Sequence, residues 1–253
     1  MKNISIILAG FALAGTSLAQ PVPDSPADEH ELQIGLAGVN SQSIYLGGSS
    51  QSRVFPAIDY QYKRFYFQAG DLGFNLIDEK NWEVDFGLGV NLAGDTDRGD
   101  SPLLENLPKL SFPVNAFLST QYKSSIGLFK LTYDHEINNK HNGHSASISY
   151  SAPIRQGQWL IMPQLSYEQH SEEVVNYFYG VNQADASTAL PAYQTGSVNN
   201  WQLGILGLRA INDKWSFIGN IQNEFYGDEI SNSPLVDDDQ RLSVFVGLLY
   251  KVF

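Results

Sequence analysis

From residue 31 to its end, this chain consists mainly of long segments in which apolar and polar residues strictly alternate. Between residues 82 and 92 every even position is apolar, and every odd position is charged, an amide or glycine. The same alternation recurs in residues 110–122, 126–136, 159–168 and 215–226. A period of two places successive side chains on opposite faces of a β-strand. The chain is therefore predicted to be all-β, with strands that have one apolar face.

The lengths of these segments favour a membrane barrel over a soluble β-sandwich. At least six segments run for eleven residues or more, whereas soluble strands average ~5–6 residues and a tilted membrane-spanning strand takes ~9–11. Aromatic rings gather at the segment ends, where they suit the membrane–water interface. They are Tyr60, Tyr62, Trp82, Tyr122, Tyr133, Trp159, Tyr167, Trp201, Trp215, Phe225 and Tyr250. The prediction is a transmembrane antiparallel β-barrel in the cell outer membrane.

The predicted connections alternate between short and long. Residues 123–125, 155–158 and 212–214 are tight, whereas 94–109, 137–143, 171–200 and 227–239 are long and polar. Short periplasmic turns and longer extracellular loops are typical of outer-membrane barrels. Residues 227–239 are therefore predicted to be an extracellular loop, and Gly227 is expected to adopt a positive φ where the loop begins.

The number of strands is not settled by counting. Eleven segments are visible, over residues 31–39, 51–62, 64–77, 82–93, 110–122, 125–136, 143–154, 158–170, 199–211, 214–226 and 239–253. Bacterial single-chain barrels have an even number. We predict twelve strands, with ten as the alternative. The missing strand is expected early, either through a turn at Ala69-Gly70-Asp71 or as a short strand at Ser43–Gly47. Phe253 lies one residue out of phase with the last apolar set, which a terminal β-bulge would reconcile.

The N-terminus is typical of an exported protein. Lys2, an apolar run over residues 4–11 and small residues up to Ala19 predict a signal peptide over residues 1–19, cleaved after Ala19. The apolar run is too short for a membrane-spanning helix. Residues 20–30 form a short polar lead, and residues 31–253 are predicted to be one barrel domain. Without the signal the chain carries 14 basic and 27 acidic residues, which argues against a nucleic-acid partner.

Two polar clusters were considered as sites of chemistry. His135, His141 and His144 lie close in sequence to Ser145, but their spacing is irregular for zinc and no Gly-x-Ser-x-Gly elbow is present. The run 237–239 is acidic but lacks the glycine-containing pattern of a calcium loop. It is expected to be a solvated tip, with divalent ions among lipopolysaccharide phosphates as the alternative. No catalytic residue, metal site or cofactor is predicted, and the role of the histidines stays open.

Charged residues on the polar strand faces are predicted to face the barrel interior. They are Glu83, Asp85, Lys130, Asp134, Glu168, Glu224 and Arg241. They either line a pore or pair with one another and fill a narrow barrel. Eight strands leave room only for side chains, and sixteen to eighteen leave an aqueous channel. A barrel of twelve strands falls between these limits.

Two loop motifs carry a family resemblance. The first comprises Tyr179, Gly180, Val181, Ala184, Ser187, Leu190 and Tyr193, and the second Gly227, Asp228, Ser233, Pro234 and Val236. With the early segments Tyr45-Leu46-Gly47 and Pro56 to Tyr60, they make the chain similar to the MipA/OmpV family of outer-membrane proteins (MltA-interacting protein family) over nearly its whole length. Family members usually end in Tyr-x-Phe, whereas this chain ends in Tyr250-Lys251-Val252-Phe253.

The resemblance implies a non-enzymatic scaffold that joins a murein lytic transglycosylase to a penicillin-binding peptidoglycan synthase. The alternatives are a small-solute, porin-like channel and a surface-exposed adhesion protein. Outer-membrane lipid and lipopolysaccharide are the other expected partners. Eight motif residues are candidates for interaction or for capping the lumen: Tyr179, Gly180, Val181, Tyr193, Gly227, Asp228, Ser233 and Pro234. The scaffold role conflicts with the predicted topology, because both motifs are expected outside the cell and the enzymes work in the periplasm.

Overall fold

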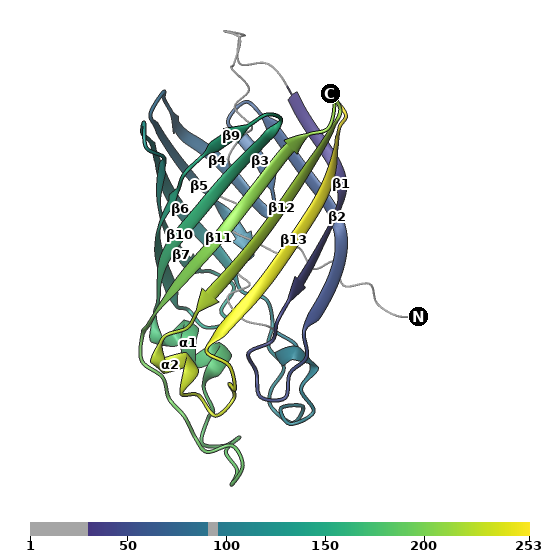
Figure 1. Cartoon of the computed structure of the whole chain (residues 1–253). Coiled ribbons are helices and arrows are strands. Elements are labelled where there is room, and N and C mark those ends of the chain that lie inside the picture. Colours follow the sequence, from purple (N-terminus) through teal and green to yellow (C-terminus); the bar gives the residue numbers. More distant parts are fainter. Residues whose placement is uncertain (1–29, 91–95) are drawn as a thin grey trace.

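Antiparallel strands form a wall that closes on itself in the structure, a computed structural model that describes residues 30–90 and 96–253 (Figure 1). The strands are β1 (His30–Ser41), β2 (Gln51–Tyr62), β3 (Phe65–Gln68), β4 (Asp71–Asp78), β5 (Trp82–Val90), β6 (Val114–Lys123), β7 (Leu128–Glu136), β8 (His144–Ser151), β9 (Ile154–Gln156), β10 (Trp159–His170), β11 (Val198–Ala210), β12 (Trp215–Phe225) and β13 (Gln240–Lys251). Each strand pairs with the next, except that β8 and β9 both pair with β10, and β13 pairs with β1 to close the wall. The predicted antiparallel barrel is confirmed.

The thirteen segments make twelve wall strands. Both β8 and β9 pair with β10, β8 opposite residues 164–170 and β9 opposite residues 159–161. Ala152-Pro153 separates them, and proline has no N–H to donate to the ladder. Segments β8 and β9 are therefore one interrupted strand. The prediction of twelve strands is confirmed, and the alternative of ten is wrong.

The missing early strand is β3. A two-residue turn at Ala69-Gly70 separates it from β4, and both turn residues have positive φ, 52° and 95°, as tight hairpin turns require. The other location considered, Ser43–Gly47, contributes only an isolated bridge from Tyr45 to Val236. With four residues, β3 pairs with the last four residues of β2. Within the described residues, the first eight residues of β2 have no ladder partner on that side.

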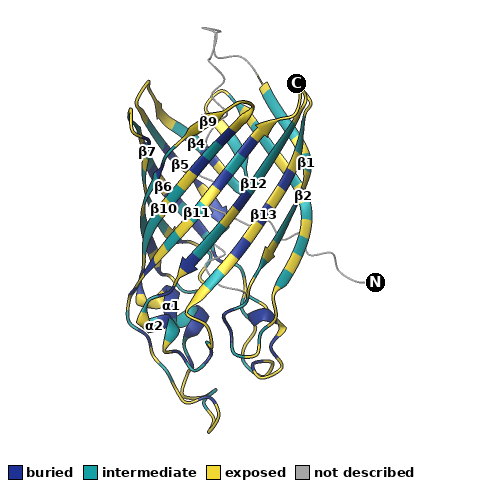
Figure 2. Cartoon of the chain, viewed as in Figure 1, coloured by how far each residue is buried: buried dark blue, intermediate teal, exposed yellow. Residues whose placement is uncertain are grey.

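The apolar face of the wall points outward (Figure 2). Along β2 the outward residue Val54 is 79% exposed, and on β1 the outward Leu36 is 64% exposed. Inward residues are buried: on β6 these are Asn115, Phe117 and Ser119. This is the reverse of a soluble protein, and it suits a wall surrounded by lipid.

The two ends of the barrel differ in construction. One end, the turn end, carries the tight β2–β3, β4–β5, β6–β7, β9–β10 and β11–β12 connections, with the start of β1 and the end of β13 beside them (Figure 1). The other end, the loop end, carries the long connections with the 3₁₀ helix η1 (Arg98–Asp100), α1 (Glu172–Tyr179) and α2 (Asp228–Ser231). None of the described helices is long and apolar enough to cross a membrane.

The structure corrects several local predictions. Helices α1 and α2 lie in segments predicted to be irregular loops, and the strand predicted from residue 110 starts at Val114. Gly227 has φ −74°, so the expected positive φ is wrong. Pairing of β13 with β1 runs in register to Lys251. Beyond it the Val252 N–H donates to the Leu32 carbonyl at 2.8 Å and the Leu32 N–H donates to the Phe253 carbonyl at 3.3 Å, so the last two residues both oppose Leu32, as the expected terminal β-bulge requires. The predicted signal peptide and most of the polar lead lie outside the described residues.

Candidate functional site

A buried apolar cluster, here called the cap, covers the loop end of the barrel. It draws its residues from four separate long connections and from the strand ends beside them. Its members are Ile44, Tyr45, Leu104, Val174, Val175, Phe178, Tyr179, Val181, Leu190, Val198, Tyr226, Ile230 and Leu235. It is the larger of the two buried apolar clusters in residues 30–90 and 96–253. Long loops have thus built a small hydrophobic core of their own.

Helix α1 supplies one side of the cap. Its buried residues Val174, Val175, Phe178 and Tyr179 recur at the spacing of one helical face. Ser171 precedes the helix, and acidic residues fill its first turn, where they complement the positive end of the helix dipole. A hydrogen bond from the Ser171 hydroxyl lowers the pKa of Glu173. The apolar spacing and the acidic start were visible in the sequence, but the helix was not predicted.

The two family motifs meet inside the cap. The Ser233 hydroxyl donates to the Tyr179 carbonyl at 2.6 Å, which joins the second motif to the first. Val181 and Tyr193 form an isolated antiparallel bridge within the first motif. The Tyr193 hydroxyl donates to the carbonyl of Glu229 in α2 at 3.2 Å. Segments that are separate in sequence thus form one hydrogen-bonded unit.

The early landmark at Tyr45 completes this unit. Its ring lies 5.6 Å from the ring of Tyr179, and its hydroxyl donates to the Phe178 carbonyl at 3.4 Å. The backbone of the same segment bonds to the second motif, because the Leu46 N–H donates to the Leu235 carbonyl at 2.8 Å. Three of the four segments of the family resemblance therefore converge in the cap, whereas Pro56 to Tyr60 lies in β2.

Two motif glycines are explained by close packing. A Cβ on Gly180 would lie 2.6 Å from the Asn176 carbonyl oxygen, and one on Gly227 would lie 2.7 Å from the Asn199 carbonyl oxygen. Asp228 opens α2, and Pro234 lies half-buried between two buried residues. The roles proposed for the eight motif residues remain predictions.

Glu136 organises the short loop that holds His141 and joins the strands that carry His135 and His144. Its buried carboxylate accepts the backbone N–H groups of Lys140, His141 and Asn142 at 2.7–2.8 Å. Burial lowers the pKa of His141, whose ring lies 5.5 Å from that of Tyr177. The histidine cluster does not assemble around a common point, because His135 and His144 are exposed and only His141 packs into the cap.

The charged residues predicted to face the interior all lie on inward positions of their strands. Several are paired. Glu224 is 2.8 Å from Arg241 and accepts the Tyr226 hydroxyl at 2.9 Å. Glu83 is 3.0 Å from Lys123, a residue that the sequence reasoning did not select. Five carboxylates against two cations in the predicted set leave the inner face acidic.

Near the middle of the wall, Lys130 lies among several carboxylates. It is close enough to Asp71, Asp85 and Asp134 to interact with each electrostatically. The Asp85 carboxylate also accepts a hydrogen bond from Asn75 at 2.5 Å and one from Ser119 at 3.4 Å. Asp71, the first residue of β4, was missed because its segment changes phase there. These contacts link side chains of neighbouring strands across the inner face.

Ser145, His170 and Glu168 form an arrangement that the sequence reasoning missed. The Ser145 hydroxyl and His170 Nδ1 are hydrogen-bonded at 2.7 Å, and His170 Nε2 is 3.8 Å from Glu168. The order resembles a hydrolase triad. However, Ser145 is 2% exposed, so a substrate carbonyl cannot reach its oxygen. The contact joins β8 to β10 beneath α1. His170 follows inward Glu168 by two residues, so extending the strand phase would have revealed it.

Cations surround the turn end. Every turn, or a strand residue next to it, carries Lys or Arg: Lys63, Arg64, Lys80, Lys123, Arg155, Arg209, Lys214 and Lys251. These are eight of the 15 basic residues in the chain. Acidic residues are fewer there: Glu31, Asp78, Glu79, Glu83 and Asp213. The loop end is the opposite, since its cap and loops carry many carboxylates. Its Lys and Arg residues in the described part are Arg98, Lys109 and Lys140 in the loops, with Arg53 and Arg241 on the adjoining strand ends.

Outward-facing aromatic rings mark two levels of the wall. Near the turn end the pairs Trp82–Tyr122, Phe129–Tyr150 and Trp215–Tyr250 have ring centroids 4.7–5.0 Å apart. Near the loop end Tyr167 and Trp201 are 4.7 Å apart. On β10, Trp159 and Tyr167 bound nine residues, a length that matches the ~9–11 residues of a tilted spanning strand. The two levels fit the two interfaces of a bilayer.

Comparisons with known proteins agree with this architecture. The family model of the MltA-interacting protein MipA matches residues 34–252. Outer membrane protein OmpV of Vibrio cholerae is 23% identical, and the match covers 99% of each chain. Outer membrane protein Omp26La of Vibrio anguillarum is 22% identical with the same coverage. Among solved structures, an outer membrane channel from Pseudomonas putida F1 is 10% identical, with a TM-score of 0.44 over 90% of this chain and 96% of that one.

Proposed function

Since the chain belongs to the MipA family, we propose that this outer-membrane β-barrel is a closed, non-enzymatic scaffold. Its partners are periplasmic peptidoglycan-remodelling enzymes, namely a murein lytic transglycosylase and a penicillin-binding synthase. The turn end faces the periplasm in this proposal, because short turns and the chain ends lie on that side of such barrels. Residues 1–19 act as the export signal and leave a single barrel domain.

The observation that carries the proposal is the row of cations at the turn end. Arg64 and Lys80 lie in the turns of two hairpins, and Arg155 lies on β9 close to the turn of a third. A protein that presents carboxylates at matching positions gains electrostatic complementarity with all of them, which favours encounter and orientation. The cap and the paired interior residues support a closed barrel, and a closed barrel suits a scaffold better than a wide porin.

This placement removes the conflict raised by the sequence. The family motifs hold the cap together at the loop end, so they need not be the surface that contacts the enzymes. The docking surface is then the turn end, where the motifs are absent. The residues of the cap act as a lid on the lumen.

The scaffold is tested by capture from a detergent extract with partner identification. The wild-type barrel is expected to retain a lytic transglycosylase and a penicillin-binding synthase. The triple change Arg64→Gln, Lys80→Gln and Arg155→Gln is expected to lose them, whereas Lys109→Gln with Lys140→Gln at the loop end retains them. Equal capture by all three proteins contradicts docking at the turn end, and no capture by the wild type contradicts the scaffold itself.

A second candidate function is a small-solute channel that prefers cations. The acidic inner face favours it, because Glu83, Asp85, Asp134, Glu168 and Glu224 outnumber Lys130 and Arg241. Planar-bilayer recording distinguishes the two functions. A channel gives discrete conductance steps whose cation preference falls with Glu83→Gln or Glu224→Gln, and Pro234→Gly in the cap increases the open time. The absence of steps in both the wild type and Pro234→Gly rejects the channel.

The membrane orientation has its own test. A cysteine introduced by Asn232→Cys, at an exposed position of the second motif, should react with an impermeant maleimide on intact cells. Reaction only after the outer membrane is broken would reverse the orientation. The N-terminus of the protein purified from outer membranes should be Gln20, and an N-terminus that retains residues 1–19 would contradict the signal peptide.

A further inference from the structure

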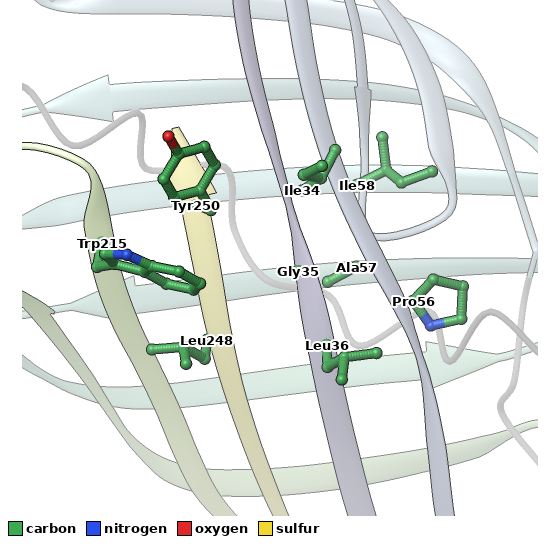
Figure 3. A pocket seen from close by; sticks show the side chains of 9 residues that line it. All are labelled: Ile34, Gly35, Leu36, Pro56, Ala57, Ile58, Trp215, Leu248 and Tyr250. Atoms are coloured by element: carbon green, nitrogen blue, oxygen red, sulfur yellow. The ribbon is translucent and has the colours of Figure 1, made fainter. Parts of the chain in front are cut away.

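An apolar groove of about 700 Å³ lies on the outer wall across β12, β13, β1 and β2 (Figure 3). Two cross-strand rows of outward side chains build it. Trp215, Tyr250, Ile34 and Ile58 form one row, and Leu248, Leu36 and Pro56 form the other. Gly35 and Ala57 lie between the flanking side chains in Figure 3 and make the floor shallow. The groove is therefore a hollow in the lipid-facing wall.

The seam between β1 and β13 runs through this groove. A Cβ on Gly35 would lie 1.9 Å from the Leu248 carbonyl oxygen. Only glycine permits this approach of the two strands. The first and last strands of the wall thus meet at the floor of this groove.

A cation lies at the turn-end side of the groove. Trp215 and Tyr250 are at the level of the turn-end aromatic rings, with centroids 5.0 Å apart. Lys214 Nζ lies 3.3 Å from the Tyr250 hydroxyl and 5.6 Å from the centre of its ring. Lys214 has no ion pair in the described part of the chain, although Asp213 precedes it in the turn. The next cation, Lys251, is 3.5 Å from Glu31. Lys214 is therefore the ammonium available to a ligand in the groove.

We propose that the groove binds an anionic phospholipid of the periplasmic leaflet, with an acyl chain in the groove and the phosphate at Lys214. This rests on the proposed membrane orientation. The aromatic rings place Lys214 at headgroup depth, where an ammonium attracts anionic lipid. Below it, the apolar rows exclude water and match the acyl chain. A lipid bound here contacts both strands of the seam and braces the closed wall.

Native mass spectrometry of the purified barrel tests the site. The protein is equilibrated with an equimolar mixture of phosphatidylglycerol and phosphatidylcholine in detergent. The wild type is expected to retain phosphatidylglycerol preferentially, and Lys214→Gln is expected to reduce that preference about fivefold. Lys80→Gln, in a turn remote from the groove, should retain it. Leu36→Trp, which fills the groove, should reduce binding of both lipids. Heat-modifiable gel migration shows that each variant is folded.

Two outcomes overturn the proposal. If Lys80→Gln reduces the preference as much as Lys214→Gln, the selectivity belongs to the whole turn end and no defined site exists. If Leu36→Trp leaves lipid retention unchanged or instead converts a dimer to a monomer, the groove is not a lipid site. Capture of periplasmic enzymes is measured separately with Lys214 unchanged, so failure of the scaffold leaves this result intact.

Discussion

The loop end and the turn end of this barrel differ in how they are built. At the loop end, long connections bury thirteen residues in the cap, and acidic groups surround it. At the turn end, short hairpins bury little, aromatic rings face outward, and cations lie in or close to every turn. The loop end behaves as a small domain with a core. The turn end behaves as a surface supported by the wall.

This difference predicts where substitutions affect stability and where they affect recognition. Cap residues contribute through burial and internal hydrogen bonds, so their loss should loosen the loop end. Turn-end cations are exposed and contribute little to folding, so their loss should change binding while the barrel stays intact. The following experiments test this contrast.

Phe178→Ala should produce the largest effect. The side chain is fully buried at the centre of the cap, and removing such a ring costs about 3–5 kcal/mol. The expected result is rapid protease cleavage and faster amide exchange in residues 171–197, with heat-modifiable migration of the barrel unchanged. Leu103→Ala, at an exposed loop-end leucine, is the control. If Phe178→Ala also unfolds the barrel, the cap and the wall unfold as one cooperative unit.

Ser233→Ala should have an intermediate effect. Its hydroxyl donates to the Tyr179 carbonyl and accepts the Leu235 N–H at 3.1 Å. Leaving these buried groups unpaired costs about 1–3 kcal/mol. Amide exchange should increase in both motif segments at once. Ser231→Ala, whose hydroxyl bonds only to a local helix carbonyl at 3.3 Å, should change exchange much less. Equal effects from the two variants would contradict the link between the motifs.

Acidification should loosen the cap by a smaller amount. Burial lowers the pKa of His141, so the opened loop binds a proton more readily than the closed one, and stability falls as pH drops below about 6.5. The lowered pKa of Glu173 acts in the same direction at lower pH, because its stabilisation is lost as pH falls through the folded pKa. Protease cleavage of the cap should rise between pH 7 and pH 5. His141→Gln should flatten the upper part of this change, and an unaltered profile would exclude His141.

Lys80→Gln at the turn end should have the smallest effect on stability. The side chain lies in a tight turn, and exposed substitutions of this kind usually change stability by no more than about 0.5 kcal/mol. The denaturant midpoint of the barrel in detergent should match the wild type. A clear fall in that midpoint would show that Lys80 contributes to the stability of the folded barrel.

Period-two alternation was sufficient to predict the wall, because the outward and inward residues of each strand can be read from that strand's own sequence. It placed Glu83, Glu224 and Arg241 on the inner face, and it indicated β3 through the change of phase at Ala69. It could not predict the cap, because Phe178, Tyr45 and Leu235 meet only after four loops fold together. Helix α1 was overlooked because its eight residues were read as part of a long polar loop. The pairing of Ser145 with His170 likewise depends on the register of β8 and β10.

The seam between β1 and β13 continues directly into the cap. The Ser41 and Ser243 hydroxyls are 2.8 Å apart across 202 residues of sequence, and the Gln42 N–H donates to the Leu242 carbonyl at 3.0 Å. A few residues further, Tyr45 bridges to Val236. Contacts this distant in sequence form slowly, since the intervening chain must first be ordered. Wall closure and cap assembly are consequently one late event in folding, and a chain that lacks its last strand can complete neither.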